Sequence, residues 1–129
     1  MTGSQLEGYV VHVLSNNGWW ALRIPRNPSG AQPFDIIAIK GSNILAVDCK
    51  ACSEPKFALK RIEDNQWMAF ERMMGRTDAV VGIVAENEGQ LYLVDYVDLI
   101  NCNRSYIALD EKYIKRFVDV CHCERRYTD

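Results

Sequence analysis

Two apolar runs, joined by a turn signal and bearing charged ends, constrain the fold of this chain most. The motif Pro-Phe-Asp ends at Asp35 and opens the run 36–39, and the run 43–47 leads into the motif Asp-Cys-Lys at 48–50. The segment between them, Lys-Gly-Ser-Asn at 40–43, has the composition of a hairpin turn. The sequence therefore predicts two antiparallel strands that carry acids and an amine at one end.

The expected pairing of these strands brings the charged groups together. Side chains alternate along a strand, so Asp48 and Lys50 share one face. A two-residue turn at 41–42 places Asp35 opposite Asp48, whereas a turn at 42–43 places Asp35 opposite Lys50. Either register collects the three side chains on one face, and a slip by one residue separates them.

Two carboxylates beside an amine point to a particular chemistry. The carboxylates can hold a divalent cation, and the lysine can act on a water molecule that attacks a phosphodiester. Because strands this apolar are typical of a sheet buried on both faces, charges at their ends need compensation. The alternative is an ordinary solvated flank, with Lys50 as the surface partner of the acids.

Composition is that of an ordinary soluble globule. The chain has 129 residues, 48% of them hydrophobic and 25% charged, which favours a single domain over 1–129 with a polar tail from about residue 122. We expect no membrane span and no secretory leader. The five cysteines are an odd number and suggest no disulfide framework, so the reducing cytoplasm, or a host cytoplasm for a phage protein, is the expected compartment.

Net charge alone does not indicate a nucleic-acid-binding protein, but its distribution is informative. The formal charge is −2, yet residues 1–61 carry seven Lys and Arg against four acids, and residues 62–129 carry eight against thirteen. The basic half is the half that holds the predicted site, and local potential matters more than the total for binding phosphate. The alternative is ordinary surface charge.

Periodicity predicts an α/β order. The expected elements are a helix over 4–16 capped by Ser4, a strand over 19–24, strands over 34–40 and 43–51, a loop over 53–61, a helix over 62–74, strands over 79–85 and 90–94, a helical turn over 97–101, an edge strand over 106–109 and a helix over 110–120 capped by Asp110. A helix crossing between 51 and 79 makes the later strand parallel to a central one, giving a mixed sheet with helices on both faces.

On these residues the chain resembles the PD-(D/E)xK nuclease superfamily, and within it the archaeal and bacterial RecU-type Holliday junction resolvases. Four further features are similar: an acid, Glu7, in the first helix; a basic loop with Ser and Gly at 26–30; the segment 57–59 followed by Gln66; and an apolar strand at 80–84. Two positions depart from the family pattern. The second acid is Asp48 where resolvases more often have Glu, and Asn65 stands where the RecU type often has His.

The resemblance implies a restriction-endonuclease-like fold and a Mg²⁺-dependent endonuclease, with Mn²⁺ as a possible substitute, that cuts branched DNA as a homodimer. It implies metal ligation by Glu7, Asp35, Asp48 and the Cys49 backbone carbonyl, and catalytic roles for Lys50 and Gln66. Arg26, Ser29, Lys56, Lys60 and Arg61 are the expected phosphate-binding residues. Trp19, Trp20, Trp67 and Tyr92 are candidates for the dimer contact or for the core.

Other functions remain open from the residues. The alternatives are a general, restriction or repair nuclease and a non-catalytic nucleic-acid-binding protein on the same fold. The pairs Cys49/Cys52 and Cys121/Cys123 could supply four zinc ligands, but neither pair has the glycine of a zinc knuckle. A thioredoxin-like redox site is disfavoured because its Cys-x-x-Cys begins a helix.

Overall fold

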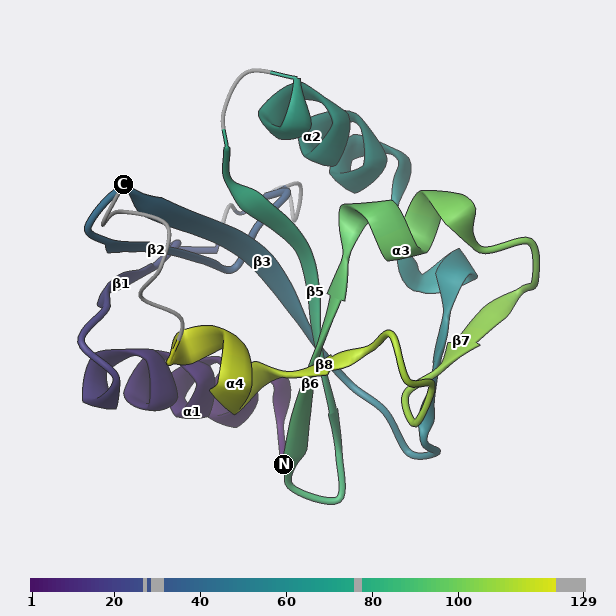
Figure 1. Ribbon diagram of the computed structural model, residues 1–129, viewed down its shortest axis with the longest axis horizontal. Helices are drawn as coiled ribbons and strands as arrows, with labels where there is room; N and C mark the ends of the chain where they lie inside the picture. The colour runs from purple at the N-terminus through teal and green to yellow at the C-terminus, as the bar shows by residue number, and fades with distance from the viewer. Residues whose placement is uncertain (27, 29–31, 76–77, 123–129) are drawn as a thin grey trace.

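A mixed sheet of six strands forms the centre of this computed structural model, which describes residues 1–26, 28, 32–75 and 78–122 (Figure 1). The strands follow the order β1-β2-β3-β5-β6-β8. Their bounds are β1 Trp20–Arg23, β2 Ile36–Lys40, β3 Asn43–Ala51, β5 Val80–Asn87, β6 Gln90–Asp95 and β8 Lys115–Arg116. The pair β3 and β5 is parallel and the other neighbours are antiparallel, which confirms the predicted α/β class with a mixed sheet.

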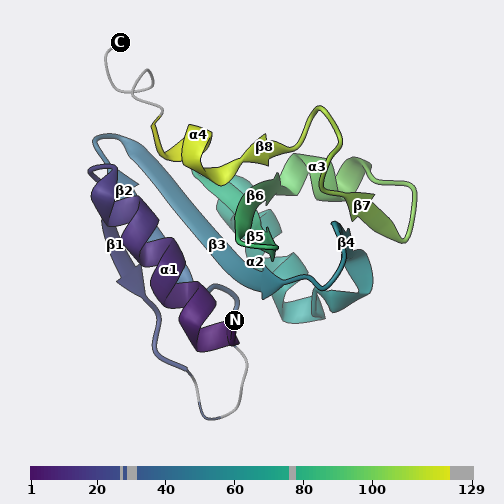
Figure 2. The ribbon, with the colours of Figure 1, turned by 90° about the horizontal axis from the view of Figure 1, so that it is seen from below.

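Helices cover both faces of the sheet, as Figures 1 and 2 show. On one face, α1 (Gly3–Asn16) and α4 (Phe117–Cys121) pack over an apolar cluster that includes Leu6 and Phe117. On the other, α2 (Asp64–Met74) and α3 (Tyr96–Asn101) cover a second cluster. The connection from β3 to α2 contains β4 (Lys56–Ala58) and the 3₁₀ turn η1 (Leu59–Arg61), and β4 pairs with β7 (Tyr106–Ala108).

The first helix begins one residue earlier than predicted. Thr2, rather than Ser4, caps it, because the Thr2 hydroxyl accepts a hydrogen bond from the Gln5 backbone N–H (3.1 Å) and the Gln5 side chain accepts one from the Thr2 N–H (2.8 Å). Leu6, Val10 and Leu14 form the buried stripe of this helix. The helix therefore lies against the sheet, with Glu7 at the edge of that stripe.

The central hairpin adopts one of the two predicted registers. Lys40 pairs with Asn43 across a two-residue turn, and Gly41 takes the positive φ of +61° that the turn requires. Ile36 pairs with Val47, and the Asp35 N–H also donates to the Val47 carbonyl at 2.9 Å, so Asp35 lies directly beyond the last residue pair of the hairpin. The alternative turn at 42–43 is excluded.

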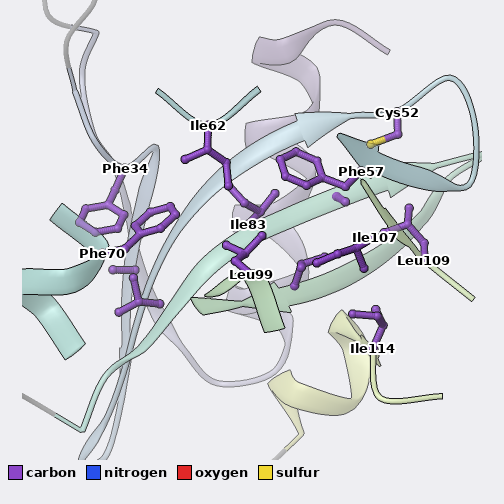
Figure 3. Close-up of a cluster of buried hydrophobic side chains, with 14 of the residues drawn as sticks. Phe34, Cys52, Phe57, Ile62, Phe70, Ile83, Leu99, Ile107, Leu109 and Ile114 are labelled. Atoms are coloured by element: carbon purple, nitrogen blue, oxygen red, sulfur yellow. The ribbon is translucent and has the colours of Figure 1, made fainter. Parts of the chain in front are cut away.

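The ring of Phe34 fixes the start of this hairpin. Figure 3 shows Phe34 against Phe70 of α2 in the second cluster, with ring centroids 5.6 Å apart. Both rings are buried. The helix after the crossover thus holds the backbone immediately before Asp35.

Two sequence-based predictions of local structure are wrong. The segment 53–61 is not only a loop, since it contains β4 and η1. The helix over 110–120 does not form: β8 pairs with the edge of β6 there, α4 begins only at Phe117, and Asp110 caps nothing helical. A helix over 110–120 would turn Tyr113 and Val118 inward, but they are 52% and 44% exposed, because backbone pairing at the sheet edge breaks the helical repeat.

Two further findings concern membrane-spanning helices and the C-terminal segment. No helix in the described part of the chain is long and apolar enough to cross a membrane. Of the predicted polar tail, His122 is described and follows α4, whereas residues 123–129 lie outside the described residues.

Candidate functional site

Asp35 and Asp48 form a buried carboxyl pair on the α2 side of the sheet. Both are less than a tenth exposed, and their side chains are hydrogen-bonded to each other. Burial raises the pKa of Asp48 to about 7, and the hydrogen bond and negative charge of Asp35 act in the same direction. The Lys50 ammonium opposes the shift but does not cancel it. Without a further cation, the pair therefore favours sharing a proton near neutral pH.

One oxygen of this pair lacks a well-directed partner. Asp48 Oδ2 lies 3.2 Å from Lys50 Nζ, an ion-pair distance, but the atom is buried and makes no hydrogen bond of acceptable geometry. A buried, unsatisfied carboxylate oxygen costs free energy unless a ligand completes its environment. A hard cation, which takes oxygen donors, fits this position.

The backbone of Cys49 contributes to the same place. Its N–H donates to Asp35 Oδ2 at 2.8 Å. Because the N–H and C=O of one strand residue point to the same side of the strand, the Cys49 carbonyl also faces the Asp35 side. The Cys49 thiol lies toward α1 on the opposite face, and burial followed by the charges of Asp35 and Asp48 raises the pKa of this thiol well above its ordinary value.

A cavity of about 190 Å³ unites most of the predicted site residues. They come from α1, the loop before β2, the end of β3 and the start of α2. Its lining comprises Glu7, Arg26, Asp35, Asp48, Cys49, Lys50 and Gln66, together with Gly3, Gln32 and Glu63. The structure therefore brings seven of the predicted positions to one place.

Glu7 stands back from the carboxyl pair. Its side chain is 6% exposed, with Oε1 3.2 Å from Arg23 Nη2 and Oε2 3.6 Å from Arg26 Nη2. Within the described ranges, no three side chains of Asp, Glu, His or Cys form a group that could hold a metal ion. Two carboxylates and a carbonyl still suit Mg²⁺, which retains several waters in its octahedral shell.

Arg23 is a component of the site that sequence reasoning missed. It ends β1, where it also donates to Ser4 Oγ at 3.1 Å. Strand alternation puts Arg23 on the face that α1 covers, and that alternation was the available signal. What the sequence could not supply is the angle at which α1 crosses β1, which brings Glu7 to this arginine.

Gln66 has a structural contact in addition to its place in the cavity. Its side-chain Oε1 accepts a hydrogen bond from the Glu63 backbone N–H at 3.0 Å, as in a capping box at the start of α2. The residue is buried. The oxygen of the amide is thus occupied by the helix cap, which leaves the amide nitrogen as the group to consider for the cavity.

The remaining predicted phosphate-binding residues are not in this cavity. Lys56, Lys60 and Arg61 lie exposed on β4 and η1, and Arg61 Nη1 donates to the Ala51 carbonyl at 2.8 Å. Ser29 lies outside the described residues. The structure therefore separates Arg26, which lines the cavity, from the three basic residues that follow β3.

The cysteine positions differ from those of the zinc alternative. Cys49 packs with the cluster under α1, whereas Cys52 belongs to the cluster under α2, so the two thiols lie on opposite faces. Cys121 is buried, and its carbonyl accepts a hydrogen bond from Trp19 Nε1 at 2.9 Å. Cys123 lies outside the described residues.

Of the four aromatic candidates for a dimer contact, one is exposed. Trp20 on β1 is 59% exposed, whereas Trp19 is buried. Trp67 packs in an aromatic group with Phe70 and Tyr96, and Tyr92 packs against the second cluster.

Comparison with known proteins gives matches to one family. The family model described as archaeal Holliday junction resolvase (Hjc) matches residues 1–122. The chain is similar to the crossover junction endodeoxyribonuclease Hje of Saccharolobus solfataricus, with 33% identity over 72 residues covering 55% of this chain and 53% of that protein. For Hje of Sulfolobus acidocaldarius the identity is 39% over 59 residues, covering 45% and 42%. These matched segments span about half the length of the curated relatives.

A solved structure shares the fold. It is that of Archaeoglobus fulgidus Hjc, a Holliday junction resolvase from an archaeal hyperthermophile, with a TM-score of 0.66 and 21% identity. The match covers 92% of this chain and 99% of that one. At this identity the likeness concerns the arrangement of the sheet and helices.

Proposed function

Because the chain belongs to the archaeal Holliday junction resolvase family, we propose that it is a metal-dependent endonuclease that resolves four-way DNA junctions by phosphodiester hydrolysis. One observation carries the proposal: the carboxyls of Asp35 and Asp48 share a cavity with Lys50, whose Nζ lies 3.2 Å from Asp48 Oδ2. A buried acid whose pKa is raised, here Asp48, beside a second acid and an amine in a cavity is typical of catalytic centres.

Mg²⁺ is the proposed cofactor, and Mn²⁺ is its expected substitute. Asp35, Asp48 and the Cys49 carbonyl are the proposed direct ligands, and Glu7 the ligand that acts directly or through water. The unsatisfied Asp48 Oδ2 supports this assignment. When bound, the ion would lower the pKa of a water molecule and offset the charge of the scissile phosphate.

Lys50 has a role that its own position supports. Its side chain is 22% exposed and faces the cavity, so its ammonium can approach a phosphate there while staying beside Asp48. We assign it to orienting the attacking water or to stabilising negative charge that develops on the phosphate oxygens. Gln66 is assigned to positioning that water or Lys50 through its amide nitrogen.

Arg26 is the proposed phosphate contact nearest the cut, together with Ser29. Its guanidinium is 72% exposed and reaches the cavity through Glu7. At 3.6 Å this is the longer of the two pairs that Glu7 makes with arginine, so Arg26 can exchange the carboxylate for a phosphate while Glu7 keeps Arg23. Lys56, Lys60 and Arg61 are proposed to act on DNA outside the cavity.

The proposed assembly is a homodimer. A four-way junction has two equivalent strands to cut, and a dimer with twofold symmetry presents two equal sites. Three exposed apolar side chains, Trp20, Leu22 and Ile39, lie on one face of the β1–β2 edge, since Trp20 pairs with Ile39. A contiguous exposed apolar face of this kind is typical of an interface, and we assign it to the contact between the two copies.

The test compares substrates and variants. The protein is incubated with a four-way junction and with linear duplex of the same sequence, with and without Mg²⁺. We expect Mg²⁺-dependent paired cuts in the junction only, and losses of at least about 100-fold in rate for Asp35→Ala and Lys50→Ala. Lys112→Ala, a change at an exposed lysine elsewhere, should cut like the parent.

Three results would contradict the proposal in different ways. Tight binding of the four-way junction with no cutting in Mg²⁺ or in Mn²⁺ would indicate a binding protein. Equal cutting of linear duplex would indicate a general or restriction-type nuclease. Activity that survives Asp35→Ala and Lys50→Ala would place the chemistry elsewhere in the molecule.

A further inference from the structure

The small sheet of β4 and β7 carries two cations on one aromatic ring. Phe57 and Ile107 pair across it and are buried, so alternation turns Lys56 and Tyr106 toward the surface. Lys56 Nζ lies 4.9 Å from the centroid of the Tyr106 ring, and the Arg104 guanidinium lies 4.9 Å from the same centroid. Arg104 Nη2 also donates to the Tyr106 hydroxyl at 2.9 Å. We call these three residues the cationic platform.

Two cations beside one ring need an explanation, because like charges repel each other. The ring attracts each cation through its negative π face, which offsets part of their repulsion. The carboxylate nearest to Lys56 is that of Glu54, at 3.9 Å with a side chain 68% exposed, a weak and easily exchanged pair. Arg104 has no salt bridge within the described ranges. The platform therefore presents concentrated positive charge with little compensation.

The platform lies within reach of the cavity. Figures 1 and 2 show β4 and β7 beyond the end of β3, outside the main sheet. Lys56 follows Lys50 by six residues, so their Cα atoms are at most about 22 Å apart. Leu59 N donates to the Ser105 carbonyl at 3.0 Å, which ties η1 to the residue between Arg104 and Tyr106. One turn of B-DNA is about 34 Å long, so a duplex arm at the cavity can also contact the platform.

We propose that Lys56 and Arg104, positioned by Tyr106, bind the phosphodiester backbone of a DNA arm next to the cut site. The inference rests on the proposed nuclease function and adds Arg104 and Tyr106 to the residues expected from the sequence. Phosphate rather than base is the ligand, because the ring already carries two cations and its hydroxyl accepts from Arg104. Arg61 is not part of the platform, and its Nη1 also connects η1 to the end of β3.

The test measures junction affinity in metal-free buffer over a range of salt concentrations. For Lys56→Gln/Arg104→Gln we expect an affinity loss of about tenfold and a decrease in the salt slope of about 1 for each lost contact. The single-turnover cutting rate at saturating protein should match the parent, because neither residue lines the cavity. Arg116→Gln, which makes one such charge change at an exposed residue of β8, is the control and should leave the slope unchanged.

Variants of Tyr106 distinguish the positioning role of its ring from the charge of Lys56 and Arg104. Tyr106→Leu keeps both cations but removes the ring, so affinity should fall several-fold while the salt slope stays near that of the parent. Tyr106→Phe, which keeps the ring, should recover most of the affinity. Equal slopes for Lys56→Gln/Arg104→Gln and Arg116→Gln, in a parent that binds and cuts junctions, would overturn this inference alone. A parent that does not bind junctions would overturn the proposed function instead.

Discussion

The buried position of Asp48 lowers the stability of the metal-free protein when its carboxyl group is ionised. Its burial beside Asp35 raises its pKa from the ordinary 3.8 to about 7, so ionising it in the metal-free protein costs free energy. The native state keeps this cost because the two acids and Lys50 must share one face. We attribute this carboxyl pair to the proposed function rather than to folding.

The pH dependence of stability follows from that shift. Between about pH 4 and 7 the folded protein binds more protons at Asp48 than the unfolded chain does, so its contribution to stability is lost as pH rises through this window. We expect the melting temperature in EDTA to fall from pH 5.5 to 8. Asp48→Asn should flatten the fall and raise the melting temperature at pH 8.

Asp98 is a second acid whose pKa is raised, and its effect on the pH profile can be compared with that of Asp48. Burial and the charge of Asp95 raise the pKa of Asp98 to about 6, a shift of the same sign that ends at lower pH. Asp98→Asn should therefore change the profile mainly below pH 6, while leaving the upper part. A melting temperature in EDTA that rises toward pH 8 in the parent would contradict the assignment of the carboxyl pair.

For single residues, the sequence was enough to predict the two acids and the amine of the site. Alternation along a strand and a two-residue turn were enough to predict that Asp35, Asp48 and Lys50 come together on one face. Arg23 was missed because its contact with Glu7 depends on helix packing, which no local pattern encodes. The contact of Arg61 with the Ala51 carbonyl was likewise hidden, because an exposed basic residue has the same sequence signature whether or not it also bonds to the backbone.

Among the elements, β5 and β6 approach each other closely at Gly82. Gly82 of β5 pairs with Asp95, and a Cβ at position 82 would contact the Val94 carbonyl oxygen and lie 2.8 Å from Asp95 Cα. Both neighbours are backbone atoms that cannot rotate away. The glycine in this strand is therefore a packing requirement.

Two glycine substitutions test this contact. Gly82→Ala should destabilise the protein by about 3 kcal/mol, since the strands must separate to admit a methyl group. Gly8→Ala, in the interior of α1 with only Arg23 Nη1 at 3.8 Å, should stabilise it by about 1 kcal/mol through helix propensity. Chemical denaturation measures both, and a neutral Gly82→Ala would contradict the close approach.

Element prediction succeeded where one periodic signal extended over a whole segment. The helix over 3–16 and the strand over 43–51 have long, unambiguous apolar patterns. The C-terminal segment failed because Ile114 and Phe117 satisfy a helical spacing equally well when a short strand precedes a short helix. Pairing with β6, a partner distant in sequence, decided between the two.

For the whole molecule, the proposed dimer depends on the exposed face of β1 and β2. A stable interface covers about 800 Å² on each partner. Trp20→Lys places a charge at the centre of that face, on an edge strand where lysine opposes association. We expect this variant to be monomeric by sedimentation equilibrium, with the parent's circular dichroism spectrum.

The matched control is Val118→Lys, at an exposed apolar residue of α4 on the opposite side of the sheet. It should remain dimeric. A dimer that persists in Trp20→Lys would move the interface to another surface. A monomeric parent that still makes paired cuts would remove the argument from twofold symmetry.

The order of helices and strands was predictable as a whole, because a helix crossing between two buried strands allows few sheet topologies. The strand at β7 was predicted as 106–109, but β4 and its pairing with β7 were not, since the two strands are three residues each and come from segments far apart in the chain. The single-domain organisation over 1–129 stays a prediction.

The unsatisfied Asp48 oxygen has a consequence beyond chemistry. A cation bound there, as proposed, would bind the native state and not the unfolded chain, so it would stabilise the fold by mass action. Lifetime in the presence of proteases would then follow the free magnesium level. Cells depleted of that ion would lose the protein through degradation as well as through inactivity.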